Sequence, residues 1–255
     1  MNFIDTYLNK QNNFVEIFNN TKVIHLAHQD ELETDMYFRQ LAASVGIPLI
    51  YEEDPVTGQI LVDQWTKIKY NAEKSSDAYK HSNKSQPLHT DYNYFSFEIY
   101  ASFLYCMEQA KFGGATTFID LDVIVHILKE FNPLLLEQLQ TTKVTFGRGI
   151  NPIATNTDYI LSKDAIGWKI NWSYFRASTD LKNKTLIDDF KDFLDTYIEK
   201  SGELSEIKLQ PGEGVFWHDR RILHGRNSFF GNRQLNKGGI AKEVPEYVMK
   251  QIIGS

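Results

Sequence analysis

The chain has 255 residues, 42% of them hydrophobic, and a formal net charge of −6, so it can bury a sizeable core and nucleic acid is not its expected partner. Its single cysteine, Cys106, excludes an internal disulfide and a thiolate zinc site. It contains neither a secretory signal nor an apolar run of ~20 residues, so we expect one cytoplasmic domain over residues 1–255 without a membrane partner.

The first half of the chain combines one helix, several strands and a long polar loop. Helical spacing of apolar residues predicts a helix over 30–45, and a turn is expected at 54–58. Residues 71–86 are polar and aperiodic, which is typical of a functional or mobile loop, and we interpret them as a lid over a site. Strands are predicted at 48–51, 60–62, 95–107 and 115–119.

The second half begins with two helices marked by their first residues. Asp120 is expected to cap a helix that runs to about residue 131, and Pro133 to open another that runs to 139. The clearest helical pattern covers 181–198, and a short helix is expected at 244–253. Strands are predicted at 143–146, 159–161 and 166–172, and three further strands, expected to pair with one another, at 206–209, 214–217 and 222–225. Together these elements predict an α+β chain with a double-sheet jelly-roll core, a double-stranded β-helix, and flanking helices.

Three residues form a candidate metal site. His89 and Asp91 are two residues apart, so at the end of a strand their side chains point the same way and can share one ion. His224, far along the chain, supplies a second imidazole. Two imidazoles and one carboxylate are the ligand set that holds non-heme Fe(II) on one face.

Three motifs carry a resemblance to a known family. They are Pro87-Leu88-His89-Thr90-Asp91, Gly113-Gly114-Ala115-Thr116-Thr117-Phe118, and the run from Phe216 to Arg226 that contains His224. In these motifs the chain resembles the Fe(II)/2-oxoglutarate dioxygenases of the taurine dioxygenase type. The ending Gly231-Asn232-Arg233-Gln234-Leu235 is more similar to the branch of the gamma-butyrobetaine and trimethyllysine hydroxylases.

The resemblance implies a set of cofactors and the residues that hold them. His89, Asp91 and His224 would bind Fe(II), and 2-oxoglutarate as co-substrate and O2 would take the open positions. Arg233 would bind the far carboxylate of 2-oxoglutarate from a strand that returns alongside the strand of His224. Thr116 would share that carboxylate, with Thr117 the weaker candidate, and Arg226 would contact 2-oxoglutarate or the substrate unless it forms an ordinary salt bridge.

Substrate contacts are predicted from position alone. Tyr92, Asn93 and Tyr94 directly follow the first metal ligands, while Asp77 and Tyr79 lie in the polar loop. The tyrosines could offer aromatic faces to an ammonium group, and Asp77 could pair with it. The alternative is ordinary packing and a solvated loop. Arg148 and Arg176 could instead hold an anionic group of the substrate, or be solvated on the surface.

The resemblance favours one reaction over several alternatives. Halogenating members of the family have Gly or Ala in place of the metal-binding carboxylate, so Asp91 favours hydroxylation of an aliphatic C–H in a small polar metabolite, an amino acid or amine, with release of succinate and CO2. Desaturation, cyclisation or C–N/C–P bond chemistry would use the same cofactors. A jelly-roll binding protein and a zinc hydrolase are the alternatives outside this class, and no oligomeric state is predicted.

Overall fold

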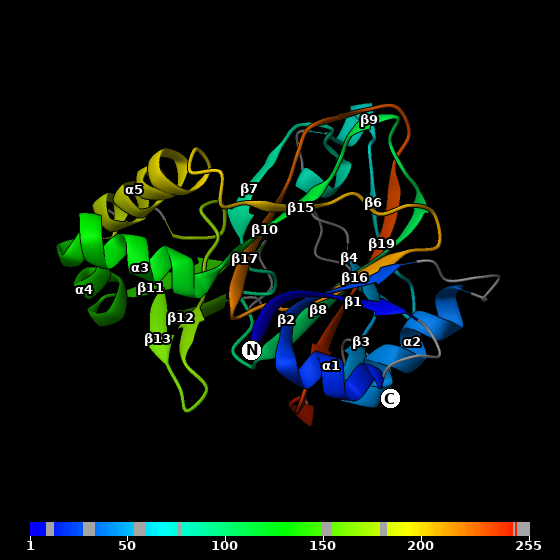
Figure 1. Ribbon diagram of the computed structural model, residues 1–255, viewed down its shortest axis with the longest axis horizontal. Coiled ribbons are helices and arrows are strands. Elements are labelled where there is room, and N and C mark those ends of the chain that lie inside the picture. Colours follow the sequence, from blue (N-terminus) through cyan, green and yellow to red (C-terminus); the bar gives the residue numbers. More distant parts are fainter. Residues whose placement is uncertain are drawn as a thin grey trace.

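In the computed structural model, the residues described are 1–8, 13–27, 34–53, 60–75, 78–148, 155–178, 183–246 and 248. These residues form an α+β structure in which two β-sheets lie beside a lobe of helices (Figure 1). Within the described ranges, no helix combines the length and apolar character needed to cross a membrane.

The larger sheet contains seven strands drawn from both ends of the chain. Its order is β1 (Asn2–Leu8), β2 (Thr21–Ala27), β16 (Gly214–His218), β8 (Ile99–Glu108), β19 (Gln234–Ala241) and β3 (Ile47–Leu49), and β6 (Thr66–Lys69) also pairs with β19. Only the pair of β1 and β2 is parallel.

The smaller sheet contains four antiparallel strands and packs against the larger one. Its order is β15 (Ser205–Ile207), β10 (Thr116–Asp120), β17 (Ile222–Arg226) and β7 (Gln86–His89). Phe118 and Ile222 of this sheet share a buried cluster with Leu104 and Trp217 of the larger sheet. The two sheets therefore enclose a common apolar core.

Alternation along β8 explains why the larger sheet is covered on both faces. Leu104 and Cys106 belong to the cluster between the sheets, whereas Phe103 and Tyr105 belong to a cluster on the opposite face. That outer face is covered by α1 (Phe14–Asn20) and α2 (Thr34–Val45), the blue helices in Figure 1.

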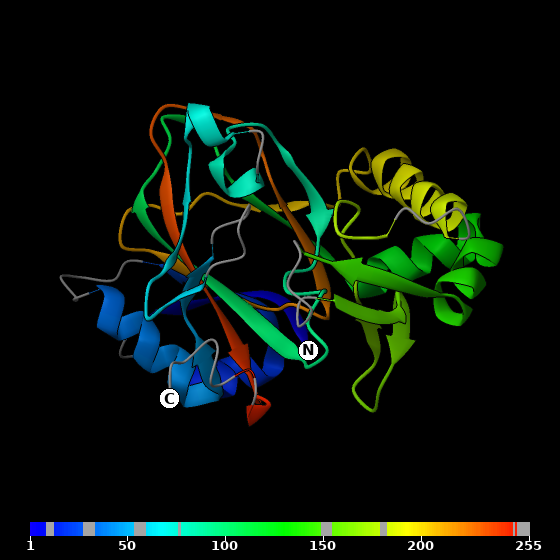
Figure 2. The ribbon, with the colours of Figure 1, turned by 180° about the vertical axis from the view of Figure 1, so that it is seen from behind.

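The helical lobe lies to one side of the sheets (Figure 2). It contains α3 (Leu121–Phe131), α4 (Pro133–Thr141) and α5 (Lys184–Phe193), and α5 continues into a π-helical turn, Leu194–Ile198. Two hairpins join it, β11 (Lys143–Gly147) with β12 (Thr155–Tyr159) and β13 (Leu161–Lys163) with β14 (Trp168–Ile170). The remaining short pairs are β4 (Tyr51–Glu53) with β5 (Ile60–Val62) and β9 (Phe112–Gly113) with β18 (Phe229–Phe230).

Local signals in the sequence predicted several elements correctly. The Asp120 side chain accepts a hydrogen bond from the Asp122 amide and caps α3, and Pro133 opens α4. Among its described residues, the polar loop has two 3-10 turns, Ala72–Lys74 and Tyr79–His81, and its last residue begins β7. The predicted helix over 30–45 is described from Thr34 onward, while the turn at 54–58 and most of the helix at 244–253 lie outside the described residues.

Strand partners were predicted less well. The three strands expected to pair with one another do not: β15 pairs with β10, β16 with β2 and β8, and β17 with β10 and β7. The strand that follows Arg233 was also misplaced, because β19 pairs in the larger sheet and not beside β17. The sequence reading missed β1, α1 and β2 altogether.

Candidate metal centre

The predicted metal ligands come together at one end of the smaller sheet. His89, the last residue of β7, lies directly opposite His224 of β17 in the strand register, and Asp91 follows two residues later. Ligand atoms of the three residues all lie within 4.8 Å of one another. His89 Nε2 is 3.6 Å from Asp91 Oδ1, and His224 Nε2 is 3.4 Å from Asp91 Oδ2.

The chemistry of these three side chains fits a divalent metal ion. Burial raises the pKa of Asp91, but Lys237 and the two imidazoles outweigh burial and hold the pKa well below its usual range. Burial, with the neighbouring His89, holds the pKa of His224 well below its usual value, so its imidazole is neutral. Asp91 Oδ2 is buried without a hydrogen-bond partner among the described residues, as expected of a donor atom that faces a metal.

Lys237 is a residue of this site that the sequence reading missed. It lies on β19 of the opposite sheet and forms an ion pair with Asp91 Oδ1. Its Nζ is 4.8 Å from the centre of the Tyr92 ring. The sequence does hold a signal for Lys237. It lies two residues after the buried Leu235, so on a strand it points to the same core-facing side, where a lysine is unusual.

Asp219 and Trp217 lie behind His224. Asp219 is fully buried, accepts a hydrogen bond of 2.9 Å from Trp217 Nε1, and has Oδ1 3.8 Å from His224 Nδ1. Burial, reinforced by the charge of Asp91, raises the pKa of Asp219 to about 7. The Trp217 ring centre lies 4.7 Å from that of His224, so the imidazole is held from behind.

A cavity of about 550 Å³ opens in front of the three metal ligands. The other candidate site residues that line it are Thr116, Arg226, Arg233, Tyr79, Tyr92, Asn93 and Tyr94, together with Arg148 and Arg176. Asp77, the remaining predicted contact, lies outside the described residues. Thr117, the weaker alternative to Thr116, is not among the described lining residues.

Arg233 is buried in this cavity with little to neutralise it. The side chain is 2% exposed, its Nε donates to the Gly114 carbonyl at 3.2 Å, and its guanidinium lies 5.5 Å from the Phe229 ring centre. Burial lowers the pKa of Arg233 to about 9, with a further contribution from Arg226. In the described part of the chain no carboxylate pairs with it, so its guanidinium is suited to a carboxylate ligand.

Arg226 holds the polar loop in place. Its guanidinium donates to three backbone carbonyls of that loop, those of Tyr79 at 3.3 Å, Ser82 at 2.9 Å and Lys84 at 2.6 Å. The sequence suggested a ligand contact or a salt bridge for Arg226, whereas these bonds are to backbone carbonyls. Through them Arg226 fixes one wall of the cavity.

The residues after Asp91 form a tight turn against the cavity. Tyr92 has a positive φ of 52°, and its ring packs against Gly239, where a Cβ atom would lie 2.9 Å from the ring. Asn93 donates from Nδ2 to the Thr90 carbonyl at 2.9 Å, and the Tyr94 hydroxyl accepts from Arg148 at 2.7 Å. These bonds brace the turn that follows Asp91.

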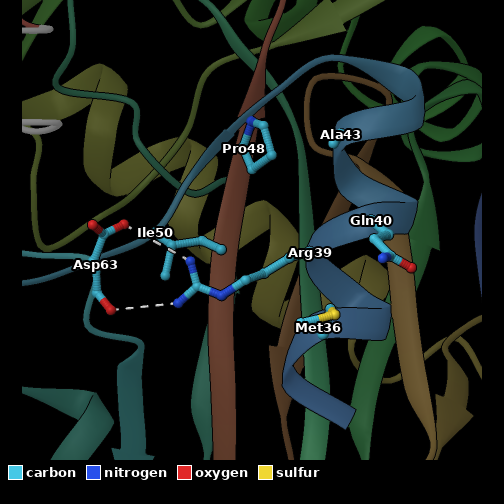
Figure 3. A pocket seen from close by; sticks show the side chains of 7 residues that line it. All are labelled: Met36, Arg39, Gln40, Ala43, Pro48, Ile50 and Asp63. Carbon is cyan, nitrogen blue, oxygen red and sulfur yellow. Dashed lines mark hydrogen bonds and ion pairs between the residues drawn. The ribbon is translucent and has the colours of Figure 1, made fainter. Parts of the chain in front are cut away.

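A second cavity lies away from these residues, against α2. It measures about 330 Å³, and Arg39 reaches across it toward Asp63 (Figure 3). Arg39 is also paired with Asp35 one turn earlier on the helix. None of the predicted site residues lines this cavity, so the candidate site is the cavity in front of His89, Asp91 and His224.

Comparison with known proteins agrees with this geometry. Residues 10–238 match the family model described as "Taurine catabolism dioxygenase TauD, TfdA family". Gamma-butyrobetaine dioxygenase of Homo sapiens is 23% identical over 160 residues, which cover 58% of this chain and 41% of that protein. The chain thus spans about two fifths of the length of the curated relatives it matches.

Solved structures share the fold at low sequence identity. The non-heme iron oxygenase OrfP, in complex with Fe and alpha-ketoglutaric acid, has a TM-score of 0.66 and 13% identity over 90% of this chain and 78% of that chain. A taurine dioxygenase from Burkholderia xenovorans has a TM-score of 0.63 and 15% identity, covering 90% and 79%. An asparagine oxygenase in complex with Fe(II), 2S,3S-3-hydroxyasparagine and succinate has a TM-score of 0.63 and 10% identity, covering 86% and 73%.

Proposed function

Because the chain belongs to the TauD/TfdA dioxygenase family, we propose that it is an Fe(II)- and 2-oxoglutarate-dependent oxygenase that hydroxylates an aliphatic C–H of a small polar metabolite, such as an amino acid or amine. The observation that carries the proposal is the convergence of His89, Asp91 and His224 on one point, with Asp91 Oδ2 buried and unpartnered among the described residues. In this proposal the two sheets are the double-stranded β-helix of one catalytic domain.

Two of the three ligands, Asp91 and His224, are already in the protonation states that metal binding requires. Asp91 stays ionised although it is buried, and His224 stays neutral, so neither must lose a proton first. When bound, ferrous iron and 2-oxoglutarate together activate O2, and 2-oxoglutarate leaves as succinate and CO2 while the substrate gains a hydroxyl group. Lys237 neutralises Asp91 Oδ1 and leaves Oδ2 for the metal.

Arg233 and Thr116 are the residues proposed to hold 2-oxoglutarate. Arg233 offers a buried guanidinium in the same cavity as the metal ligands, and Thr116 lies on β10, two residues from the neighbour of His224 in the strand register. On an antiparallel sheet, residues two apart point to the same face, so the Thr116 hydroxyl and His224 face the cavity together. Arg226 acts indirectly, because its hydrogen bond to the Tyr79 carbonyl fixes the loop that lines the cavity.

Ionised Asp91 supports hydroxylation over halogenation. Desaturation, cyclisation and C–N/C–P bond chemistry use the same residues and differ in the substrate that enters the cavity. A zinc hydrolase would use the three ligands but would give Arg233 no role, and a jelly-roll binding protein would require neither the ligands nor Arg233.

The test is an anaerobic titration of the Fe(II)-loaded protein with 2-oxoglutarate. We expect a weak visible charge-transfer band and, after air is admitted, release of succinate. The His224→Ala variant should lose both signals, whereas His126→Ala, which replaces an exposed histidine of α3, should keep them. If iron binds and the band does not form, the oxygenase proposal fails and the zinc hydrolase or binding protein replaces it.

A further inference from the structure

Positive side chains are concentrated around the cavity of the metal centre. Besides Arg226, Arg233 and Lys237, its described lining includes Lys80, Lys84, Arg148 and Arg176. Asp91 is the only acidic residue among the described lining residues, although the whole chain has 33 Asp and Glu against 27 Lys and Arg. The cavity is therefore strongly positive in a protein that is negative overall.

Several of these cations contact backbone or acidic groups elsewhere in the chain. Arg226 binds backbone carbonyls, Lys237 pairs with Asp91, and Lys80 pairs with Glu52. Arg233 is the proposed partner of 2-oxoglutarate. Arg148 and Arg176, which also have contacts within the chain, lie together against one residue, Tyr94.

The backbone holds Arg148 and Arg176 side by side. The amide of Gly147, the residue before Arg148, donates to the Arg176 carbonyl at 2.9 Å, and Phe146 and Ala177 form an antiparallel bridge. The guanidinium of Arg148 lies 5.5 Å, and that of Arg176 6.0 Å, from the centre of the Tyr94 ring. Two guanidinium groups held side by side at the cavity wall can together donate several hydrogen bonds to an anion with several oxygen atoms.

The aromatic faces of the cavity are already in contact with other side chains. Lys237 lies over Tyr92, both arginines lie against Tyr94, and the Tyr79 ring packs on Phe175 at 5.0 Å between centres. An ammonium group placed on Tyr92 or Tyr94 would meet a protein cation within a few ångströms. Tyr92 and Tyr94 thus already carry protein cations, which disfavours an ammonium group on these two rings.

We propose that Arg148 and Arg176 form the binding site for an anionic group of the primary substrate, a carboxylate, sulfonate or phosphonate. The substrate is consequently an anion at this end and not a quaternary ammonium. This inference rests on the proposed function only in reserving Arg233 for 2-oxoglutarate. An amino acid bound through its carboxylate satisfies both proposals.

The test uses two fluorinated probes of opposite charge and a paramagnetic metal. The full chain is loaded with Co(II) and saturated with 2-oxoglutarate, and ¹⁹F relaxation is measured for trifluoromethanesulfonate and for (2,2,2-trifluoroethyl)trimethylammonium at equal ionic strength. Zn(II)-loaded protein gives the diamagnetic reference. We expect saturable relaxation enhancement for the sulfonate and none for the ammonium.

Variants assign the binding to the two arginines. Arg148→Gln and Arg176→Gln should each raise the dissociation constant of the sulfonate at least tenfold, and the double variant should abolish the enhancement. Arg148→Lys, which keeps the charge, should restore part of the affinity. Arg39→Gln, at the other cavity (Figure 3), is the matched control and should bind as the unaltered protein does. Thermal unfolding checks that each variant is folded.

Each outcome decides the proposal. It is overturned if the ammonium probe gives the larger enhancement, if the double variant binds the sulfonate unchanged, or if the unaltered protein shows no saturable enhancement. Failure of 2-oxoglutarate to alter the visible spectrum of the Co(II) protein would instead refute the proposed function. Line widths of the same probes with metal-free protein still decide the anion site if Co(II) does not bind.

Discussion

Arg233→Met should stabilise the protein without ligand and weaken its binding of 2-oxoglutarate. Arg233 is 2% exposed and has only the Gly114 carbonyl as a hydrogen-bond acceptor among the described residues. Methionine has a similar length and flexibility but no charge to desolvate. The variant therefore separates the effect of the guanidinium on folding stability from its effect on the affinity for a bound carboxylate.

The depressed pKa of Arg233 sets the scale of the effect on stability. Lowering the pKa of Arg233 from 12.5 to about 9 corresponds, at roughly 1.4 kcal/mol per pKa unit, to a cost on the order of 5 kcal/mol for keeping the buried group charged. The unfolded chain stays protonated up to its higher pKa, so this cost is fully present at pH 7.5 and is relieved only as pH rises above about 9. Replacing buried ion pairs by apolar side chains of similar volume is often neutral or gains about 1 to 4 kcal/mol, and a gain in this range corresponds here to a Tm increase of several degrees.

The loss of affinity is larger. Removing one member of a buried, hydrogen-bonded charge pair costs about 2 to 5 kcal/mol, which is a roughly 30- to 3,000-fold higher Kd for 2-oxoglutarate. Calorimetry on Co(II)-loaded protein gives the Kd, and scanning calorimetry without ligand gives the Tm. A variant with a lower Tm and an unchanged Kd would refute the assignment of Arg233 as the buried carboxylate receptor.

Three further predictions concern the surroundings of the site. Lys237→Met removes the cation beside Asp91, so Co(II) should bind about tenfold more tightly by calorimetry, and weaker binding would contradict this electrostatic reasoning. Burial lowers the pKa of His218, so the protein should lose up to about 1.4 kcal/mol of stability per pH unit as pH falls below 6.5. The urea midpoints measured at pH 7.5 and 5.5 should therefore differ less in the His218→Gln variant than in the unaltered protein. Equal differences would show that His218 does not cause the pH dependence. Gly225→Ala places a Cβ 2.7 Å from the Gln86 carbonyl, so it should cost about 1 to 3 kcal/mol of stability and weaken metal binding, and an unchanged Tm would argue against this close packing.

Local chemistry explains why some elements, and the convergence of His89, Asp91 and His224, could be predicted. Asp120 and Pro133 mark helix starts by hydrogen bonding and backbone geometry that depend on neighbouring residues only. His89 and Asp91 are two residues apart, and their motifs place His224 with them. The three side chains converge because His89 ends β7, Asp91 follows two residues later, and His89 is paired with His224 in the register of β7 and β17.

Long-range pairing explains what could not be predicted. The apolar run at 214–217 indicates a buried strand, but nothing within it specifies β2 and β8 as partners. The same lack of local signal affected β19, and with it the position of Lys237. The contacts of Arg226 with the polar loop depend on side-chain direction across two chain segments, which a single sequence does not encode locally.

The order of the strands also determines when a metal can be bound during synthesis. His89 and Asp91 precede His224 by more than a hundred residues, and β7 and β10 are joined into one sheet only through β17, as β2 and β8 are joined only through β16. Contacts between such distant segments form late and slowly. Until then the nascent chain offers two metal ligands and not three. The three side chains can therefore converge only after residues 222–226 have been synthesised and β17 has paired with β7.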